Sequence, residues 1–227
     1  MKNIQKLAGF SAISEALIYI IAFIYFGAFW SYPSAGSATE KMAYMAENHL
    51  MFSSIYFLMY VVFGVLLAVL VIGLHERLKD TKHPAMAIGS LFGAIWVGLV
   101  IASGMISNIG LAHAIGIMDS SPEKALDLWI IISLITESIG GGNELVGGLW
   151  VLLVSVVALK AGEFSKSLNY LGLIVGVAGI STVYPNETLT EIFGITQIAW
   201  FIWLGISMLT QENTNESPQS TARPSID

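Results

Sequence analysis

The sequence predicts an all-α, polytopic membrane protein with six transmembrane helices and both chain ends in the cytoplasm. Three observations carry this prediction. Only 11% of the 227 residues are charged, whereas soluble domains carry about 25%. Apolar stretches of about 20 residues recur along the whole length, and each can cross a hydrocarbon core of about 30 Å. The basic residues, finally, gather at alternate ends of these stretches, as the positive-inside rule describes.

Composition also excludes several kinds of site. The chain has no cysteine, so disulfides, thiolate catalysis, cysteine-bound zinc and iron–sulfur clusters are all excluded. The net charge is −6 and no basic patch is present, so nucleic acid is not an expected partner. The expected partner is the lipid bilayer, no cofactor motif is present, and the sequence leaves the oligomeric state open.

The first two helices are separated by a polar loop. The first apolar run, Leu7–Trp30, is longer than the 7–15 residues of a signal-peptide core, and it contains Glu15, so we expect a retained helix. Pro33 ends it. Residues 31–48 are predicted to form a polar loop, and the second helix is predicted over His49–Leu74.

The third and fourth helices are predicted over Ala85–Met118 and Ala125–Leu159. At 1.5 Å per residue each is roughly 50 Å long, which exceeds one perpendicular crossing. Either both helices project beyond the outer surface, or each breaks. The expected breaks lie at Ser107–Gly110 and at Gly140–Gly142.

The fifth helix is predicted over Leu168–Tyr184. Asn186 is a suitable cap for the sixth, which continues to about Leu209. A six-helix transmembrane domain is therefore expected over residues 1–210, followed by a disordered cytoplasmic tail over residues 211–227.

The basic residues set the predicted orientation. With the N-terminus inside, eight Lys and Arg residues lie at inner positions and two at outer positions. A seven-span alternative splits the fourth helix at its glycines. It would place three of the eight inner basic residues outside, and it needs two short spans joined by a three-residue turn, so we reject it. The inner residues are Lys2, Lys6, Arg77, Lys79, Lys82, Lys160, Lys166 and Arg223, and the outer ones are Lys41 and Lys124.

An acidic, glycine-rich stretch interrupts the apolar fourth helix. In an unbroken helix Glu137, Gly141, Glu144 and Gly148 share one face, because their spacings are four, three and four residues. Lipid does not satisfy carboxylates, so this face should meet other helices or a wet cavity. Counting from the inner loops places Glu144 in the outer third of the membrane.

The leading hypothesis is a non-enzymatic binding or transport-like protein with an acidic pocket that opens outward. Glu144 is its main ligand-facing group and favours a small cationic or neutral ligand over an anion. The candidate ligand-binding residues are Glu15, Asn108, Glu137, Asn143, Glu144 and Gln197. The candidate hinge or packing residues are Gly140, Gly141, Gly142, Gly147 and Gly148.

Two alternatives stay open. In a structural or accessory subunit the same polar groups only hold helices together, with a protonated Glu15 hydrogen-bonded to Gln197, Asn143 or a serine. In a membrane metalloenzyme His49 and His113 would join the acidic residues. However, the sequence has no His-x-x-x-His or His-Glu-x-x-His spacing, so no metal ligands are assigned.

Two segments carry a family resemblance. Gly142–Trp150 and, after a basic turn, Leu168–Gly179 resemble a bacterial family of six-pass integral membrane proteins of unknown function. The similarity is best over Glu137–Tyr184. It implies the six-helix architecture and no chemistry, because the family offers no catalytic residues to carry over.

Overall fold

The computed structural model describes residues 2–81, 83–141, 144–184 and 186–214, and this part of the chain is all-α, as predicted. The predicted third helix is confirmed almost to the residue. In chain order the α-helices are α1 (Lys2–Ile24), α2 (Ala38–Glu47), α3 (His49–Tyr56), α4 (Phe63–Leu78), α5 (Pro84–Ile117), α6 (Pro122–Thr136), α7 (Leu145–Ala161), α8 (Lys166–Ser181) and α9 (Glu187–Thr214).

Short π-helical turns join several of these helices into longer apolar rods. Four rods in the described chain are long and apolar enough to cross a membrane: Asn3–Phe29, His49–Thr81, Pro84–Ile117 and Glu187–Thr210. The π-helical turns are η1 (Tyr25–Phe29), η2 (Phe57–Val62) and η4 (Glu137–Gly141), and η3 (Lys79–Thr81) is a 3₁₀ turn.

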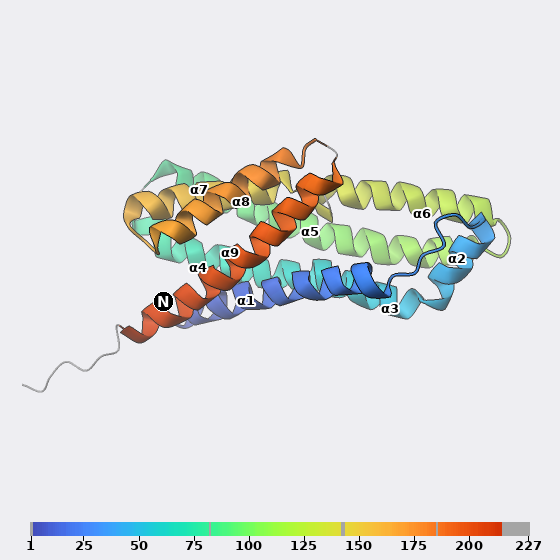
Figure 1. Ribbon diagram of the computed structural model, residues 1–227, viewed down its shortest axis with the longest axis horizontal. Coiled ribbons are helices and arrows are strands. Elements are labelled where there is room, and N and C mark those ends of the chain that lie inside the picture. The colour runs from blue at the N-terminus through green and yellow to red at the C-terminus, as the bar shows by residue number, and fades with distance from the viewer. Residues whose placement is uncertain (1, 82, 142–143, 185, 215–227) are drawn as a thin grey trace, which may run out of the picture.

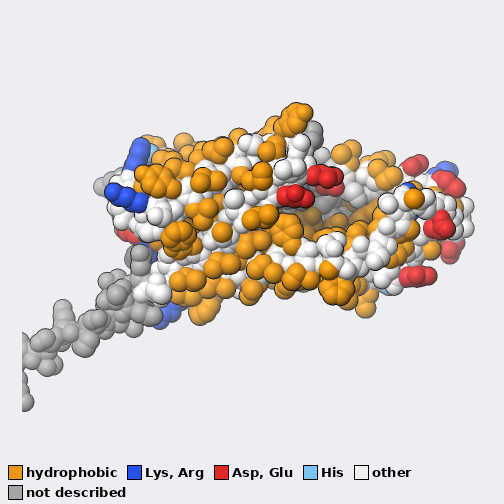
Figure 2. Space-filling model, viewed as in Figure 1, with side chains coloured by type: hydrophobic (Ala, Val, Ile, Leu, Met, Phe, Trp, Pro, Cys, Tyr) orange, Lys and Arg blue, Asp and Glu red, His pale blue; other side chains and the backbone are white. Residues whose placement is uncertain are grey.

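Six helices close into a ring. Each of α1, α4, α5, α7, α8 and α9 packs against the next in that order, and α9 packs back against α1. They lie side by side along one half of the elongated molecule, with Lys2 and Thr214 at the same end (Figure 1). Apolar side chains cover much of the outer surface of the ring (Figure 2), which suits contact with lipid.

Aromatic rings fill the inside of this six-helix ring. Phe63, Trp96, Trp150, Trp200 and Phe201 form a continuous series in which successive ring centroids are 5.5–5.9 Å apart. The series closes on itself, because Phe201 also lies 6.1 Å from Phe63. These spacings are typical of favourable aromatic pairs, each of which adds about 0.5–1.5 kcal/mol beyond the burial of its area. The core is therefore rigid and tightly packed.

Glycines set the closest helix contacts. A Cβ atom on Gly148 would lie 2.6 Å from the Ile180 backbone nitrogen and 2.8 Å from the Gly176 carbonyl oxygen, so α7 and α8 touch backbone to backbone. A Cβ atom on Gly147 would lie 2.6 Å from the Trp96 ring. These two glycines allow the close approach that small residues give to membrane helices.

The other half of the molecule is an extension with its own core. Here α2 packs on α6, and α5 lies between α3 and α6. The buried residues of this second core are Met42, Met45, Phe52, Leu111, Ala114, Ala125, Trp129 and Ile132. The projection of long helices beyond the six-helix ring, one of the two alternatives for α5, is therefore what the structure shows.

The predicted polar loop over residues 31–48 is wrong, since it contains α2. Ser37 and Glu40 form a capping box at its start: the Glu40 backbone N–H donates to Ser37 Oγ, and the Ser37 backbone N–H donates to Glu40 Oε2. Met42 and Met45 then face the second core. A polar sequence forms a helix here because its first turn is capped and two methionines anchor one side.

The predicted break at Ser107–Gly110 is also wrong, because α5 runs unbroken for 34 residues. Two of its serines form hydrogen bonds without a break. Ser107 Oγ lies 2.9 Å from Thr136 Oγ1, and Ser103 Oγ donates to the Leu99 carbonyl oxygen one turn earlier. Hydrogen bonds of this kind replace the contact with water that a kinked helix would offer.

The predicted fourth helix, Ala125–Leu159, is interrupted. Its α-helical part ends at Thr136, turns through η4, and resumes at Leu145. Gly142 and Asn143, a candidate hinge residue and a candidate ligand-binding residue, lie outside the described residues. Successive glycines disfavour helix by about 1 kcal/mol each, which explains an interruption at this place. The two parts follow one another along the long axis (Figure 1).

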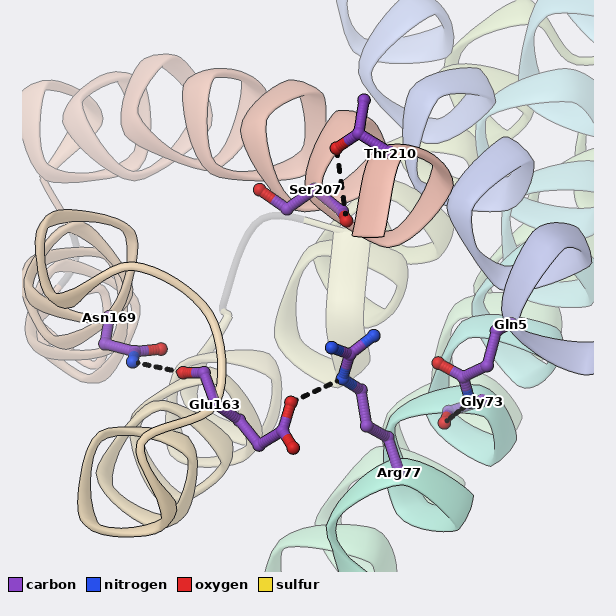
Figure 3. Close-up of polar contacts among 7 residues, drawn as sticks. All are labelled: Gln5, Gly73, Arg77, Glu163, Asn169, Ser207 and Thr210. Atoms are coloured by element: carbon purple, nitrogen blue, oxygen red, sulfur yellow. Dashed lines mark hydrogen bonds and ion pairs between the residues drawn. The ribbon is translucent and has the colours of Figure 1, made fainter. Parts of the chain in front are cut away.

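Opposite charges occupy opposite ends of the molecule. Basic side chains gather at the end of the six-helix ring that carries both described chain ends, and acidic ones gather on the extension (Figure 2). At the basic end Arg77 Nε donates to Glu163 Oε2 over 2.8 Å, and Gln5 Nε2 donates to the Gly73 carbonyl oxygen over 2.8 Å (Figure 3). Asn169 Nδ2 donates to the Glu163 carbonyl oxygen. These bonds join α1, α4 and the α7–α8 turn.

Candidate functional site

Three of the predicted site residues are buried inside the six-helix ring. Glu15 on α1 and Gln197 on α9 have no exposed surface, and Glu144 at the start of α7 is 8% exposed. Carboxyl groups are almost never fully buried in proteins unless they are paired. Two of them inside one apolar bundle therefore mark this region as the candidate site.

The position of Glu15 follows from the spacing of α1. Ser11, Glu15, Ile18 and Ala22 recur at steps of four, three and four residues, and all four are buried. The same side of α1 contacts α4 and α9. Glu15 is consequently held between helices and away from lipid.

Glu144 is placed by the interruption before α7. It occupies the N-cap position, with φ −101° and ψ 25°. Its backbone N–H donates to Thr182 Oγ1 over 2.8 Å, and the Thr182 hydroxyl donates to the Gly179 carbonyl oxygen over 2.7 Å. The start of α7 is thereby fixed to the end of α8, while the Glu144 side chain lines a cavity.

This cavity has a volume of about 70 Å³ and lies between α1, α4, α5 and the start of α7. A polar cavity needs about 10–15 Å³ to hold one water molecule, so it has room for a few waters or one small polar molecule. Its lining is apolar apart from two hydroxyls and one carboxyl. The lining residues are Ile18, Tyr19, Ala22, Met59, Tyr60, Phe63, Val100 and Glu144.

Tyr19 connects the two carboxyl groups. It lies one helical turn beyond Glu15 on α1, and it is within electrostatic range of Glu15, Glu144 and Tyr60. Trp96 is similarly close to Glu144. The two glutamates, which are far apart in the sequence, thus both influence one tyrosine.

Several polar atoms at this site have no hydrogen-bond partner among the described residues. They are both carboxyl oxygens of Glu15, Oε2 of Glu144, both amide atoms of Gln197 and Nε1 of Trp96. Each buried polar atom that lacks a partner costs about 1–3 kcal/mol. A site that tolerates several of them is suited to bind something that supplies the missing bonds. The hydrogen bond from Glu15 to Gln197 or a serine, which a purely structural role predicts, is not formed within the described chain.

Glu137 and Glu144 do not share a pocket. Glu137 is exposed on η4 and lines a separate groove of about 440 Å³ in the extension. The expectation of one common face is wrong because it depended on an unbroken helix, and the helix is interrupted between Gly141 and Leu145. Of the candidate hinge residues, Gly140 and Gly141 belong to η4, and Gly147 and Gly148 are packing contacts of α7.

The remaining candidates lie away from the cavity. Asn108 is half-buried on α5 with its Oδ1 atom unpaired, and it lines neither the cavity nor the groove. His49 and His113 are exposed. In the part of the chain that the structure describes, no group of three or more His, Asp or Glu side chains could hold a metal ion.

Sequence reasoning missed Tyr19, Tyr60 and Trp96. Tyr19 follows Glu15 by four residues, and that spacing alone could have placed it on the buried face of α1. Nothing in the sequence signals that Tyr60 and Trp96 converge on Glu144, because they belong to helices that only the fold brings together.

Comparisons with family models, curated proteins and solved structures find no match to this chain. The resemblance of Gly142–Trp150 and Leu168–Gly179 to a bacterial six-pass family therefore stays a prediction. The site has to be interpreted from its own geometry.

Proposed function

We propose that this chain is a non-enzymatic, transport-like membrane protein that binds a small cation or a small neutral polar molecule inside its helical bundle. One observation carries the proposal: the buried carboxyl groups of Glu15 and Glu144 both act on Tyr19, which with Glu144 lines a cavity within the otherwise apolar ring. Ionisable groups at membrane depth typically mark ion or substrate pathways.

The electrostatics of the site select the ligand class. A charged carboxylate at the centre of a membrane helix costs about 2.5–3.5 kcal/mol on insertion scales. The Glu144 carboxyl lines the cavity, and among the described residues no Lys or Arg does so. A cation or a proton offsets the charge of this carboxylate, whereas an anion is repelled by it. Neutral ligands with hydrogen-bond donors also suit the unpaired oxygens.

We further propose six membrane crossings with both ends of the chain in the cytoplasm. The closed ring of six helices and its basic end support this arrangement. Two crossings would use the shorter helices α7 and α8, of 17 and 16 residues. Their lengths of about 24–26 Å at 1.5 Å per residue are close to the hydrocarbon thickness. The acidic extension would then project outside the membrane.

A structural subunit is the second candidate. The backbone contact of Gly148 with α8 and the Ser107–Thr136 hydrogen bond are devices that hold helices together. They leave the polar atoms of Glu15, Glu144 and Gln197 without a role, however. The ligand-binding hypothesis uses all three and is therefore preferred.

Replacing Glu144 tests the choice between the two candidates. We expect Glu144→Gln to fold normally, because glutamine keeps the shape of the side chain. The wild-type protein should show a raised midpoint of thermal unfolding with sodium, ammonium or methylammonium ions or on a change of pH, and the variant should lose that response. The measurement is thermal unfolding of the purified full chain in detergent.

Glu191→Gln is the matched control, since Glu191 is exposed on α9 and does not line the cavity. It should keep the wild-type response. If Glu144→Gln only lowers the unfolding midpoint and the response to every probe is unchanged, or if the wild type responds to none, the structural subunit is the correct interpretation.

A further inference from the structure

The groove in the extension is walled by aromatic rings. Its six aromatic residues come from η1 and the chain after it, from α3 and from α6. They form one continuous cluster in which neighbouring ring centroids lie 4.3–6.4 Å apart. These residues are Phe26, Trp30, Tyr32, Phe52, Tyr56 and Trp129. The space-filling view shows the molecule hollowed between α6 and the chain that follows α1 (Figure 2).

Among the residues that the structure describes, Glu137 is the single charged one in the groove lining. It stands at the end of α6 near Tyr56, on which its charge acts. Ile130, Ser133 and Leu134 complete the wall, so no Lys or Arg lines the groove. The groove is therefore a π-rich, apolar space with one negative charge.

The aromatic rings of the groove differ from an interfacial aromatic belt. Belt residues point outward to the lipid headgroups. Here Trp129 and Phe52 are 8% and 3% exposed, and Trp30 stacks on Tyr32 with an interplanar angle of 2°. The rings pack on one another and together line the groove.

The volume suits a small organic molecule. At about 440 Å³ the groove lies within the 300–1,000 Å³ that small-molecule pockets typically occupy. Aromatic walls attract cations through the negative faces of their rings, and recognition of quaternary ammonium groups is the best-known use of such walls. A carboxylate adds a direct charge contact. The surrounding surface of the extension is also predominantly acidic, which raises the local concentration of cations.

We propose that this groove binds an organic ammonium ion, with alkyl groups on the aromatic rings and the positive charge facing Glu137. This inference names a ligand class for the proposed function. It rests on the proposed function in one respect, which is the placement of the groove on the outer side of the membrane. The groove is a separate outer site, and its tyrosine wall leads inward: Tyr56 lies 5.4 Å, centroid to centroid, from Tyr60, which lines the buried cavity.

The test measures binding of choline and tetraethylammonium to the purified full chain, by tryptophan fluorescence and by calorimetry. Trp30 and Trp129 line the groove and should report occupancy directly. Choline should bind at least tenfold more tightly than 3,3-dimethylbutanol, its uncharged isostere, and binding should weaken with salt. Glu137→Gln should lower the affinity for both cations about tenfold, and Trp30→Leu should also weaken it.

Glu123→Gln is the matched control, because Glu123 is an exposed acid on the same helix that does not line the groove. It should keep wild-type affinity. The proposal is overturned if the uncharged isostere binds as tightly as choline, if Glu137→Gln and Glu123→Gln behave alike, or if neither cation binds at millimolar concentration. An equally tight isostere would assign the groove to a neutral chain such as a lipid tail. Should Trp30→Leu fail to fold, the isostere and Glu137→Gln still decide the question.

The outcomes separate this inference from the proposed function. Suppose that Glu137→Gln binds the cations as the wild type does and that Glu144→Gln loses its thermal response. The groove is then not the cation site, and the proposed buried site is kept. The opposite pair of results leaves the groove as a binding site and removes the proposed role of the buried carboxyl groups.

Discussion

At the residue scale, single atoms decide how closely the helices of the ring approach. Gly148 has no room for a Cβ atom because the α8 backbone lies 2.6 Å from where that atom would be. Glu144, four residues earlier, is held by the hydroxyl of Thr182 at the end of the same helix. The contact that brings α7 against α8 thus also fixes the backbone that carries the buried carboxyl group.

Gly148→Ala should consequently destabilise the protein. The added methyl group meets backbone atoms, which cannot rotate away, and overpacking of this kind costs about 1–3 kcal/mol. Gly98→Ala on α5 is the matched control, since a Cβ atom there meets nothing within 4 Å. It should be neutral or stabilise the helix by up to about 1 kcal/mol. Equal denaturation midpoints for the two variants in detergent would contradict the proposed packing.

Part of the buried site was predictable from single residues. Glu15, Glu144 and Gln197 were identified because polar side chains in apolar stretches are costly. Their neighbours Tyr60 and Trp96 were not, because aromatic residues are ordinary in membrane helices and only the fold shows which of them face a carboxyl group. Asn108 was chosen by the same argument as Glu15, yet it lies outside both cavities.

At the scale of elements, the capping box explains why α2 forms in a polar segment. The Ser37 backbone N–H and hydroxyl both donate to the Glu40 carboxylate and lower the pKa of that exposed carboxyl below its ordinary value. A lowered pKa means that the folded α2 prefers the charged carboxylate. Its contribution to stability is therefore present above the ordinary pKa of a glutamate and is lost as the pH falls through the folded-state pKa.

We accordingly expect α2 to lose protection first when the protein is acidified. Hydrogen exchange of the α2 amides should accelerate at acidic pH in the wild type. Glu40→Gln should remove that pH dependence and show faster exchange already at neutral pH. Glu47→Gln, at the other end of α2 and outside the capping box, is the control and should behave as the wild type does. Identical profiles for all three proteins would refute the role of the box.

Element boundaries were predictable where a proline or a cap fixes them. Pro84 stands at the first position of α5, and Asn186 Oδ1 accepts a hydrogen bond from the Thr188 backbone N–H at the start of α9, as predicted. The glycine segment after Glu137 was harder, because glycines suit both tight packing and a break. The structure uses them for both: Gly140 and Gly141 lie in the π turn, and Gly148 lies in a packing contact.

At the scale of the whole molecule, the architecture was predictable because hydrophobic length is a strong signal. The apolar stretches of the sequence became the helices of the ring, and α9 extends to Thr214, slightly beyond the expected domain end. The extension could not be foreseen in detail. Its core pairs Met42 and Met45 with Trp129, residues that neither length nor periodicity connects.

The proposed orientation makes a direct prediction about reporter fusions. A reporter at Gly162, between α7 and α8, should be cytoplasmic, because Lys160 and Lys166 flank this position. A reporter placed after Thr214 should be cytoplasmic too, because the proposed six crossings return the chain to that side. A reporter inserted between Asp119 and Ser121, at the tip of the extension, should be extracytoplasmic. Fluorescence and phosphatase activity of the fusions give the side for each position.

Two results would contradict this arrangement. An extracytoplasmic reporter at both Gly162 and Thr214 would support the seven-span alternative, with a membrane re-entry at the interruption before α7. A cytoplasmic reporter at the tip of the extension would mean that the whole molecule has the opposite orientation in the membrane.

The closed ring has a consequence for the order of synthesis. Because α9 is the last helix of the ring to be made and α1 is the first, the ring closes only after α9 has been synthesised. Until then the side of α1 that carries Glu15 has no α9 beside it, and the nascent chain holds a polar group in the bilayer without its final cover. A chain that stops before α9 therefore leaves Glu15 exposed to lipid, or to the proteases that remove unfinished proteins.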